Sequence, residues 1–502
     1  MTARVAALSR AVCLGVLLLS GCAHAQPAAP AVNVRAQRAL TGDLDRIFGA
    51  PPTANALWGV QIKSLDSGRT LYSRNASTLM MPASNMKILT LAVAAERLGW
   101  DYRFTTTLET SGVVEAGVLH GDLVVRSNGD PTMSTRGKRG AHVLDEWADA
   151  LKAAGITGIH GRIVGDDQAF DDEGVGPGWS WDYLEAGYAA PVGALQYNEN
   201  TADLTTAPGT AVGDPIIVQL AAGSGFSVMN RATTGEGADS GRRGAINVTR
   251  RIDRPELEIS GMIPLGAPSV SRLVAVINPT VFFAQSLRDG LIARGIPVGG
   301  DDVDVDDLAG EPAMAYARRV LATTSSPSLR EVATVLMKVS QNQYAETLLK
   351  AIGASTGGVG TTGSGRRAAA ETLASWGIPA DSYVMSDGSG LSRYNYVAPS
   401  TITAILARMH GDLKHREAFV ATLPIAGKDG TISTRMRKTR AEANAVAKTG
   451  SIANVRSLSG YVRTRNGELL AFSIIANDFV LPAATINYIS DTAVEALANL
   501  RR

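Results

Sequence analysis

The sequence predicts a multidomain α+β protein in which an antiparallel sheet, flanked by helices, is interrupted by inserted β-rich domains. Three observations predict this class. A hairpin pattern lies near the N-terminus, strand patterns and a helix pattern lie near the C-terminus, and residues 105–315 change to short strands punctuated by Gly, Asp and Pro. With 502 residues, 45% of them hydrophobic, the chain is long enough for two or three domains.

The N-terminus has the pattern of an export signal over residues 1–25. Arg4 and Arg10 come before the apolar run "AVCLGVLLLS", and small residues follow it. Two cleavage patterns overlap there. "LSGC" resembles a bacterial lipobox, which would end the signal at residue 21 and leave Cys22 as a lipidated membrane anchor, whereas "AHA" suits ordinary signal peptidase. The protein is therefore expected to be exported to the periplasm, as a lipoprotein or in soluble form.

Composition argues against several kinds of site and partner. Cys13 and Cys22 are the only cysteines and both lie in the signal segment, so the mature chain is expected to have no disulfide and no cysteine-based metal site. None of the six His residues forms a recognisable metal pair, so no metal and no cofactor is expected. The 48 basic and 47 acidic residues form no basic stripe, which argues against nucleic acid as a partner.

The first folded elements follow a Pro/Ala-rich linker at residues 26–35. Residues 57–75 alternate apolar and polar side chains on either side of an Asp-Ser-Gly turn, which is a hairpin signal. Residues 86–99 are apolar on nearly all sides, as is typical of a buried helix. Further helices are predicted at 143–155 and 282–295, within the β-rich region.

The C-terminal part returns to the first domain. Residues 326–353 contain two helix patterns, the first opening with a capping box from Ser328 to Glu331, and a polar corner between them. Three strand patterns at 441–478 and a helix pattern at 483–500 complete the sheet. The predicted domains are a discontinuous main domain at 36–104 and 315–502, an inserted domain at 105–190 and 273–314, and a nested domain at 191–272.

The first candidate site residues are Ser84 and Lys87, at the start of the helix predicted from residue 86. A Ser at this position is commonly an ordinary N-cap, and that interpretation needs no Lys. Residues three apart on a helix share a face, however, and a neutral Lys held there can remove the proton from a serine hydroxyl. The two interpretations differ in whether Ser84 is structural or a nucleophile.

Two further patterns favour the nucleophile. Ser340-Gln341-Asn342 forms the polar corner between two helices, and Lys448-Thr449-Gly450 lies on a strand. In order and in setting, these patterns and Ser84-x-x-Lys87 resemble the motifs of the penicillin-recognising serine enzymes. With "SNGDPT", "SDGSGLSR" and "LPIAGKDGTI", the mature chain more closely resembles the D-alanyl-D-alanine carboxypeptidase/endopeptidase branch, the class C low-mass penicillin-binding proteins. A DD-peptidase/β-lactamase-like fold is implied.

The resemblance implies an acyl-enzyme on Ser84, formed from peptidoglycan peptides or β-lactams. Lys87 is the candidate base, because burial and repulsion from Lys448 would lower its pKa. Ser340 is placed to relay a proton to the leaving amine, and the Asn342 amide to hold both Lys87 and a substrate carbonyl.

Substrate recognition is assigned to the strand that carries Lys448. Lys448 and Thr449 suit the terminal carboxylate of a D-Ala-D-Ala peptide, and Gly450 would leave the strand bare so that substrate can lie against it. By resemblance, the backbone N–H groups of Ser84 and Ser451 form the oxyanion hole. The "SDGSGLSR" stretch is expected to be a structural turn beside the site.

Other interpretations stay open. Asp166 is the best match to an acidic residue that contacts the amino group of the stem-peptide diamino acid in this branch, although a turn Asp is an equal alternative. A β-lactamase or esterase on the same fold, and a non-catalytic peptidoglycan-binding protein, are the alternative functions. An α/β-hydrolase elbow matches only at residues 353–357, where "GASTG" follows a helix, not a strand.

Overall fold

A computed structural model describes residues 34–51, 55–137, 139–237, 245–308 and 317–501. The predicted export signal, with Cys22, and most of the predicted linker lie outside the described residues. No helix in these ranges has the length and apolar character needed to cross a bilayer.

The main sheet joins the two ends of the chain, as the sequence predicts. Its order is β2-β1-β22-β21-β20, and all neighbours are antiparallel. Residues 57–75 form the predicted hairpin, with a register shift between Ile62 and Lys63. The strands are β1 (Leu57–Ser64), β2 (Thr70–Arg74), β20 (Val446–Ile452), β21 (Val455–Arg463) and β22 (Leu469–Asn477).

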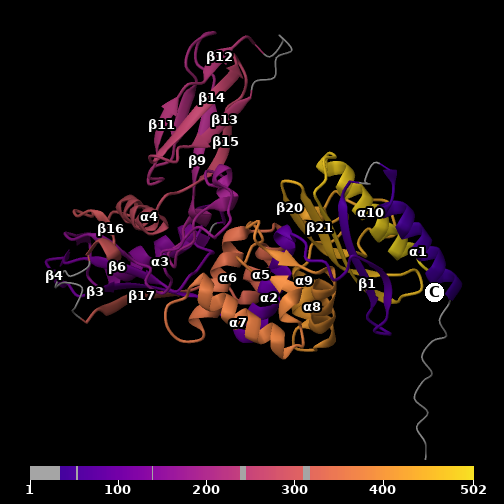
Figure 1. The fold of residues 1–502 in the computed structure, drawn as a ribbon. Coiled ribbons are helices and arrows are strands. Elements are labelled where there is room, and N and C mark those ends of the chain that lie inside the picture. Colours follow the sequence, from indigo (N-terminus) through magenta and orange to yellow (C-terminus); the bar gives the residue numbers. More distant parts are fainter. Residues whose placement is uncertain (1–33, 52–54, 138, 238–244, 309–316, 502) are drawn as a thin grey trace, which may run out of the picture.

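Helices cover both faces of this sheet (Figure 1). α1 (Val34–Phe48) and α10 (Ala483–Asn499) pack on one face, and α1 is a helix that the sequence analysis did not assign. All nine residues of β22 are buried because both faces are covered. On the other face, α8 (Pro399–Gly411) contacts β1, β21 and β22. It shares one hydrophobic core with α2 (Met86–Arg97), α5 (Leu329–Lys338), α6 (Asn342–Ala354), α7 (Thr362–Ser375) and α9 (Arg416–Thr422).

The inserted region begins with a second five-stranded sheet of order β16-β8-β6-β3-β17. Because β17 pairs with β3, this sheet continues past residue 314, where the sequence analysis ended the inserted domain. Its strands and helices are β3 (Thr105–Thr110), β6 (Leu123–Ser127), β8 (Ile163–Asp166), β16 (Asp302–Asp304), β17 (Arg319–Ser325), α3 (Arg139–Ala153) and α4 (Pro279–Ala293). A small sheet beside it contains β4 (Val113–Glu115), β5 (Val118–His120) and β7 (Gly158–Ile159).

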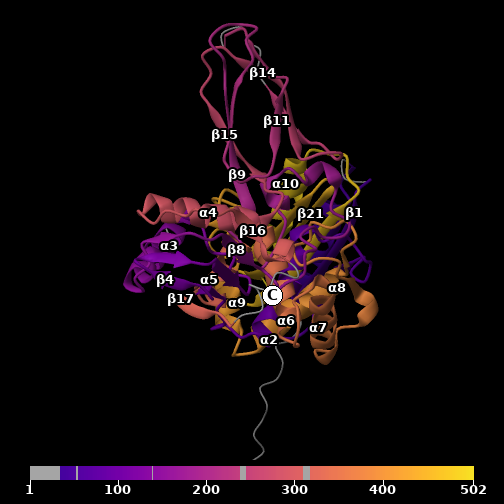
Figure 2. The ribbon, with the colours of Figure 1, turned by 90° about the vertical axis from the view of Figure 1, so that its left-hand side faces the viewer.

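Two further sheets form an arm that projects from the rest of the molecule (Figures 1 and 2). β15 pairs with β9 through residue 275, so the return crossing lies beyond residue 272, the predicted boundary. The arm contains β9 (Thr201–Ala207), β10 (Ile217–Leu220), β11 (Ser227–Asn230), β12 (Thr233–Gly235), β13 (Ile246–Arg250), β14 (Glu256–Pro264) and β15 (Val270–Ala275). A two-stranded hairpin of β18 (Tyr383–Val384) and β19 (Tyr396–Val397) lies in the main domain.

Candidate active site

Ser84 lies in a short 3₁₀ helix, η2 (Ala83–Asn85), that runs directly into α2. The N-cap interpretation is wrong, because Asn85 occupies the N-cap of α2 and makes no side-chain cap bond. The Asn85 amide instead donates to the Lys448 backbone oxygen at 2.9 Å, which ties the start of α2 to β20. Ser84 is therefore free of a capping role and half-buried.

Lys87 is fully buried one helical turn from Ser84. Its ammonium has three hydrogen-bond partners: Ser84 Oγ at 3.0 Å, Asn342 Oδ1 at 2.6 Å and the Ser389 backbone oxygen at 2.8 Å. These match the three donors of a lysine ammonium, so the side chain is held in one position. The structure thus brings Ser84, Lys87 and Asn342 together as the sequence predicts.

Burial lowers the pKa of Lys87 to about 7, and the carboxylates of Asp387 and Glu346 oppose this shift. The sequence analysis named Lys448 as a cause of this shift together with burial; in the structure burial is the largest cause for Lys87, and burial, followed by repulsion from Lys87, lowers the pKa of Lys448 well below its ordinary value. A substantial fraction of Lys87 is therefore neutral near pH 7, and a neutral amine can accept the Ser84 proton.

Two buried carboxylates beside Lys87 were not found from the sequence. Glu346 on α6 accepts hydrogen bonds from the backbone N–H groups of Gly388 and Ser389, at 2.9 and 2.7 Å. Burial, and then the charge of Asp387, raises the pKa of Glu346 to about 7. These hydrogen bonds to Glu346 fix the turn predicted for "SDGSGLSR", and the turn places the Ser389 carbonyl against Lys87.

Asp387 fixes the same turn from within. Its carboxylate accepts from the backbone N–H groups of Gly390 and Ser392, from the Asn395 amide and from the Trp179 indole, at 2.6–3.0 Å. Trp179 belongs to the inserted region, so the turn also joins the two parts of the molecule. The contact with Trp179 could not be predicted from a short motif, because the two residues are 208 positions apart.

Ser340 and Lys448 form a second hydroxyl–lysine pair. Lys448 Nζ donates to Ser340 Oγ at 2.7 Å and to the Thr449 backbone oxygen at 2.8 Å. Ser340 occupies the corner between α5 and α6 with φ of 65°, a backbone conformation that is uncommon for a residue other than glycine. The Asn342 amide nitrogen donates to the Tyr188 carbonyl at 2.8 Å, which links the corner to the inserted region.

The structure gives a different reason for a glycine at position 450 from the predicted one, which was to leave the strand bare for substrate. A Cβ at this position would lie 2.6 Å from the Pro82 oxygen and 3.0 Å from the Ser84 nitrogen. The missing side chain thus lets the backbone around Ser84 approach β20. Thr449 Oγ1 lies 2.7 Å from Thr431 Oγ1, in a hydrogen bond that orients its side chain.

A cavity of about 450 Å³ opens over these residues. It lies beside β20, the last strand in the order of the main sheet, where an extended peptide can lie along the strand. Lys448 is fully buried and does not line the cavity. The lining residues are Ser84, Tyr183, Tyr188, Ser340, Asn342, Gly390, Leu391, Thr431, Thr449, Ser451, Ile452, Ala453 and Arg456.

Asp166 does not line this cavity. It lies at the end of β8, nearly buried, and its carboxylate pairs with Arg318 at 2.8 Å and Arg126 at 3.9 Å. Its charge is therefore neutralised within the protein, which favours the structural alternative over contact with substrate.

The sequence match to an α/β-hydrolase elbow at residues 353–357 lies at the end of α6. There Ser355 Oγ donates to the Ile352 carbonyl, as expected for helix termination.

The fold and this cluster define a class of protein: a penicillin-recognising serine enzyme, with a hydroxyl–lysine pair on a helix beside the edge of an antiparallel sheet. The chain belongs to the D-Ala-D-Ala carboxypeptidase 3 (S13) family, whose model matches residues 40–500.

Individual relatives agree with this assignment. The chain is 34% identical to the D-alanyl-D-alanine carboxypeptidase of Actinomadura sp. (strain R39), over 88% of this chain and 82% of that protein. It is 28% identical to D-alanyl-D-alanine carboxypeptidase DacB of Haemophilus influenzae, over 84% of this chain and 85% of that protein. The crystal structure of penicillin binding protein 4 (dacB) from H. influenzae matches with a TM-score of 0.78 and 25% identity, covering 91% and 99% of the two chains.

Proposed function

We propose that the protein is a serine-type D-Ala-D-Ala carboxypeptidase that also acts as a DD-endopeptidase on peptidoglycan cross-links. The observation that carries this proposal is the 3.0 Å hydrogen bond between Ser84 Oγ and the buried Lys87 Nζ, at the floor of a cavity beside β20. Membership of the family supports the substrate class.

In the acylation step, neutral Lys87 takes the Ser84 proton while Oγ attacks the carbonyl carbon of the penultimate D-Ala. The backbone N–H groups of Ser84 and Ser451 receive the oxyanion. The proton taken by Lys87 is passed on through Ser340, which is bonded to Lys448, to the amine nitrogen as the peptide bond breaks, so that D-Ala leaves and both Lys87 and Ser340 regain their starting protonation states. Water then hydrolyses the ester on Ser84.

Recognition of the terminal carboxylate rests on Thr449 and Lys448 in different ways. Thr449 lines the cavity and can donate a hydrogen bond directly. Lys448 lies behind it, fully buried, so it acts by positioning Ser340 and Thr449 through hydrogen bonds. This arrangement refines the predicted direct contact between Lys448 and substrate.

Substrate turnover distinguishes this function from a β-lactamase. In a D-Ala-D-Ala peptide the leaving D-Ala departs and opens space for water beside Lys87, whereas the amine of an opened penicillin stays tethered and blocks that space. We expect release of D-Ala from muramyl pentapeptide, cleavage of D-Ala to diamino-acid cross-links and a penicilloyl adduct that persists for minutes or longer. Chromatography of the peptides and mass spectrometry of the protein measure these outcomes.

Rapid penicillin turnover without release of D-Ala would support the β-lactamase and contradict the peptidase. Failure to form an adduct or to release D-Ala would support the non-catalytic peptidoglycan-binding alternative. A lactamase could use a tyrosine such as Tyr344 on α6 to activate water, but Tyr344 is buried and does not line the cavity.

We also propose that the protein acts outside the cytoplasm, where its substrate lies. The overlapping patterns at residues 19–25 leave two forms. Lipidation at Cys22 predicts that radiolabelled palmitate tags the protein in a bacterial host and that Cys22→Ala removes the tag. An untagged protein with its mature N-terminus at Gln26 would contradict lipidation and identify the soluble periplasmic form.

A further inference from the structure

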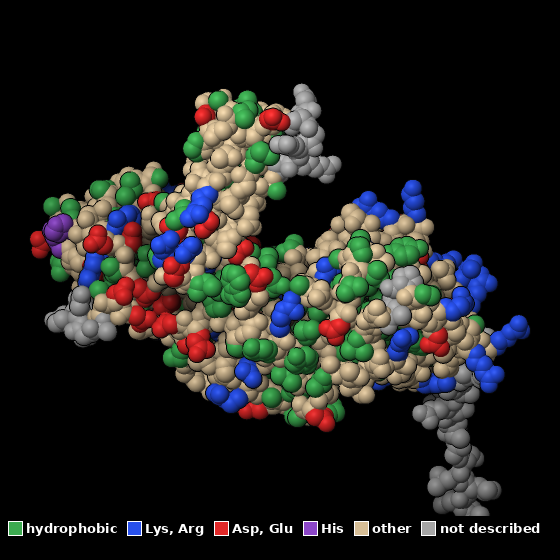
Figure 3. Space-filling view, turned by 45° about the horizontal axis from the view of Figure 1, so that its top comes forward, with side chains coloured by type: hydrophobic (Ala, Val, Ile, Leu, Met, Phe, Trp, Pro, Cys, Tyr) green, Lys and Arg blue, Asp and Glu red, His purple; other side chains and the backbone are tan. Residues whose placement is uncertain are grey.

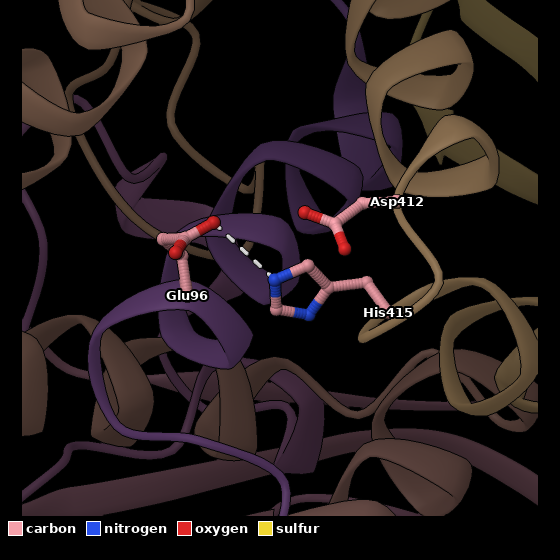
Figure 4. Close-up of side chains that lie close together, drawn as sticks. All are labelled: Glu96, Asp412 and His415. Carbon is pink, nitrogen blue, oxygen red and sulfur yellow. Dashed lines mark hydrogen bonds and ion pairs between the residues drawn. The ribbon is translucent and has the colours of Figure 1, made fainter.

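The described parts of the chain contain two groups of side chains of the kinds that bind metals, and within each group the side chains lie close to one another. The first, Glu96, Asp412 and His415, does not suit a metal ion (Figure 4). The Trp100 indole N–H donates to His415 Nδ1 at 3.2 Å, so the hydrogen of the neutral imidazole is on Nε2, which faces Glu96 Oε2 at 3.3 Å. Because Nε2 bears that hydrogen, its lone pair is unavailable to a metal. This group is a hydrogen-bonded contact between α2 and the loop before α9.

The second group is Asp167, Asp304 and Asp306. Asp167 follows β8, Asp304 ends β16, and Asp306 lies in the short helix η8 (Val305–Leu308). β8 and β16 are parallel neighbours with Asp304 opposite Gly165, which places the ends of the two strands together. One carboxylate oxygen from each of the three residues lies within 4.8 Å of the other two.

The buried member of this group has an unsatisfied oxygen. Asp167 is only 8% exposed; Oδ2 accepts from the Thr280 hydroxyl, but Oδ1 is buried and has no hydrogen-bond partner. A buried carboxylate oxygen without a partner is costly and calls for a ligand. The partners of the other two carboxylates are neutral amides or backbone: Asn278 Nδ2 donates to Asp304 at 3.1 Å, and Gln168 Nε2 to Asp306 at 3.2 Å.

No Lys or Arg among the described residues forms an ion pair with any of the three carboxylates. Nearby acidic residues contrast with them: Asp166 pairs with Arg318, Asp302 with Arg288 and Asp171 with Lys350. Figure 3 shows acidic side chains gathered on this face, where the inserted sheet meets the helical part of the molecule. The group therefore concentrates negative charge that the protein itself does not neutralise.

We propose that Asp167, Asp304 and Asp306 bind one hard divalent cation, Ca²⁺ or Mg²⁺. An all-oxygen set of carboxylates favours these ions over softer metals. Calcium–oxygen distances of about 2.3–2.6 Å allow ligands on opposite sides of an ion to be about 5 Å apart, so three oxygens within 4.8 Å of one another can share it. Water would complete the coordination, because Asp306 is exposed.

The site would act on structure, not on chemistry at Ser84. The chain after Asp167 runs to Asp171, whose carboxylate pairs with the buried Lys350 of α6 at 2.6 Å. Lys350 also donates to the backbone oxygens of Asp171 and Glu173 at 3.0 Å. A cation at Asp167 thus fixes one end of a segment that joins the inserted sheet to α6, the helix that begins with Asn342.

This proposal differs from the expectation that the protein has no metal site. That expectation rested on cysteine and histidine patterns, whereas the proposed ligands are three aspartates, two of which lie more than 130 positions after the first. Only the pairing of β8 with β16 brings them together.

The test uses the purified mature protein after treatment with a chelator and dialysis. CaCl₂ and MgCl₂ are titrated in separate arms, by calorimetry and by thermal unfolding. We expect binding of one ion per chain and a rise in Tm of about 1–3 °C at roughly millimolar cation, in one arm or both. Asp306→Asn, at an exposed position, is expected to fold and to weaken binding at least tenfold, whereas Asp381→Asn, an exposed aspartate far along the chain, binds as the wild type does.

Absence of binding in both arms would overturn the proposal and indicate that a proton, not a cation, satisfies Asp167. Equal binding by wild type and Asp306→Asn would overturn it as well, because it would place the ion elsewhere. Asp304→Asn provides a second variant with the same expected loss. These readouts do not depend on peptidase activity.

Discussion

Replacing Ser84 with alanine is expected to abolish covalent labelling by a fluorescent penicillin and to lower D-Ala release by about 10⁴-fold or more. The variant removes Oγ and leaves Lys87 with no hydroxyl to activate at 3.0 Å. The neighbouring hydroxyl of Ser340 cannot replace it, because it is hydrogen-bonded to Lys448 instead. Gel fluorescence after incubation with the penicillin, and chromatography of the released D-Ala, measure the effect.

The matched control is Ser355→Ala. Ser355 is the central serine of the sequence match to an α/β-hydrolase elbow, and its hydroxyl bonds the Ile352 carbonyl at the end of α6. We expect this variant to label as the wild type does. Equal labelling of Ser84→Ala and wild type would remove Ser84 as the nucleophile, and loss of labelling only in Ser355→Ala would move the nucleophile to the helix end.

The parts of the fold that follow from local pattern could be predicted from the sequence. The hairpin at 57–75, the helix from residue 86 and the three C-terminal strands have clear local patterns, either alternation or a continuous apolar run, and the structure has each of them. The limits of the inserted sheets could not be predicted so well. Whether β17 belongs to the main or the inserted domain depends on its pairing with β3, about 210 positions earlier, and its own sequence does not specify that partner.

The same distinction holds within the site. Ser84, Lys87, Ser340, Asn342 and Lys448 were predicted from short motifs, and the structure brings them into two hydrogen-bonded groups, Ser84 and Asn342 with Lys87, and Ser340 with Lys448. The buried carboxylates beside Lys87 could not be predicted in this way, because an isolated Glu on a helix is usually exposed.

Those carboxylates matter because they set the charge of Lys87. Burial alone would favour the neutral amine more strongly, and Glu346 and Asp387 restore part of the stability of the ammonium. The result is a pKa near 7, suited to a group that must accept a proton and later return it. The sequence indicated the base but not the groups that tune it.

The second large effect is expected at Lys87 itself. Lys87→Ala should lower the acylation rate about a thousandfold or more while the protein still folds, because serine activation requires a positioned proton acceptor. Lys87→Arg is the informative companion: it keeps a positive charge near Ser84 and Asn342, but a guanidinium does not lose its proton in proteins. Stopped-flow acylation with a chromogenic β-lactam measures both variants. Near-normal acylation by Lys87→Arg would show that charge, not proton transfer, is what Lys87 supplies.

The pH dependence of wild-type acylation tests the same assignment. With a folded pKa of about 7, against about 10.5 for an ordinary lysine, Lys87 is protonated below pH 7 and neutral above it. The acylation rate should therefore rise with pH through a midpoint near 7 and then level off. Glu346→Gln removes a carboxylate that raises the pKa of Lys87, so its midpoint should lie lower than that of the wild type. A rate independent of pH between 5 and 9, by contrast, would exclude Lys87 as the group that takes the proton, since about one pH unit on either side of the midpoint changes the neutral fraction severalfold.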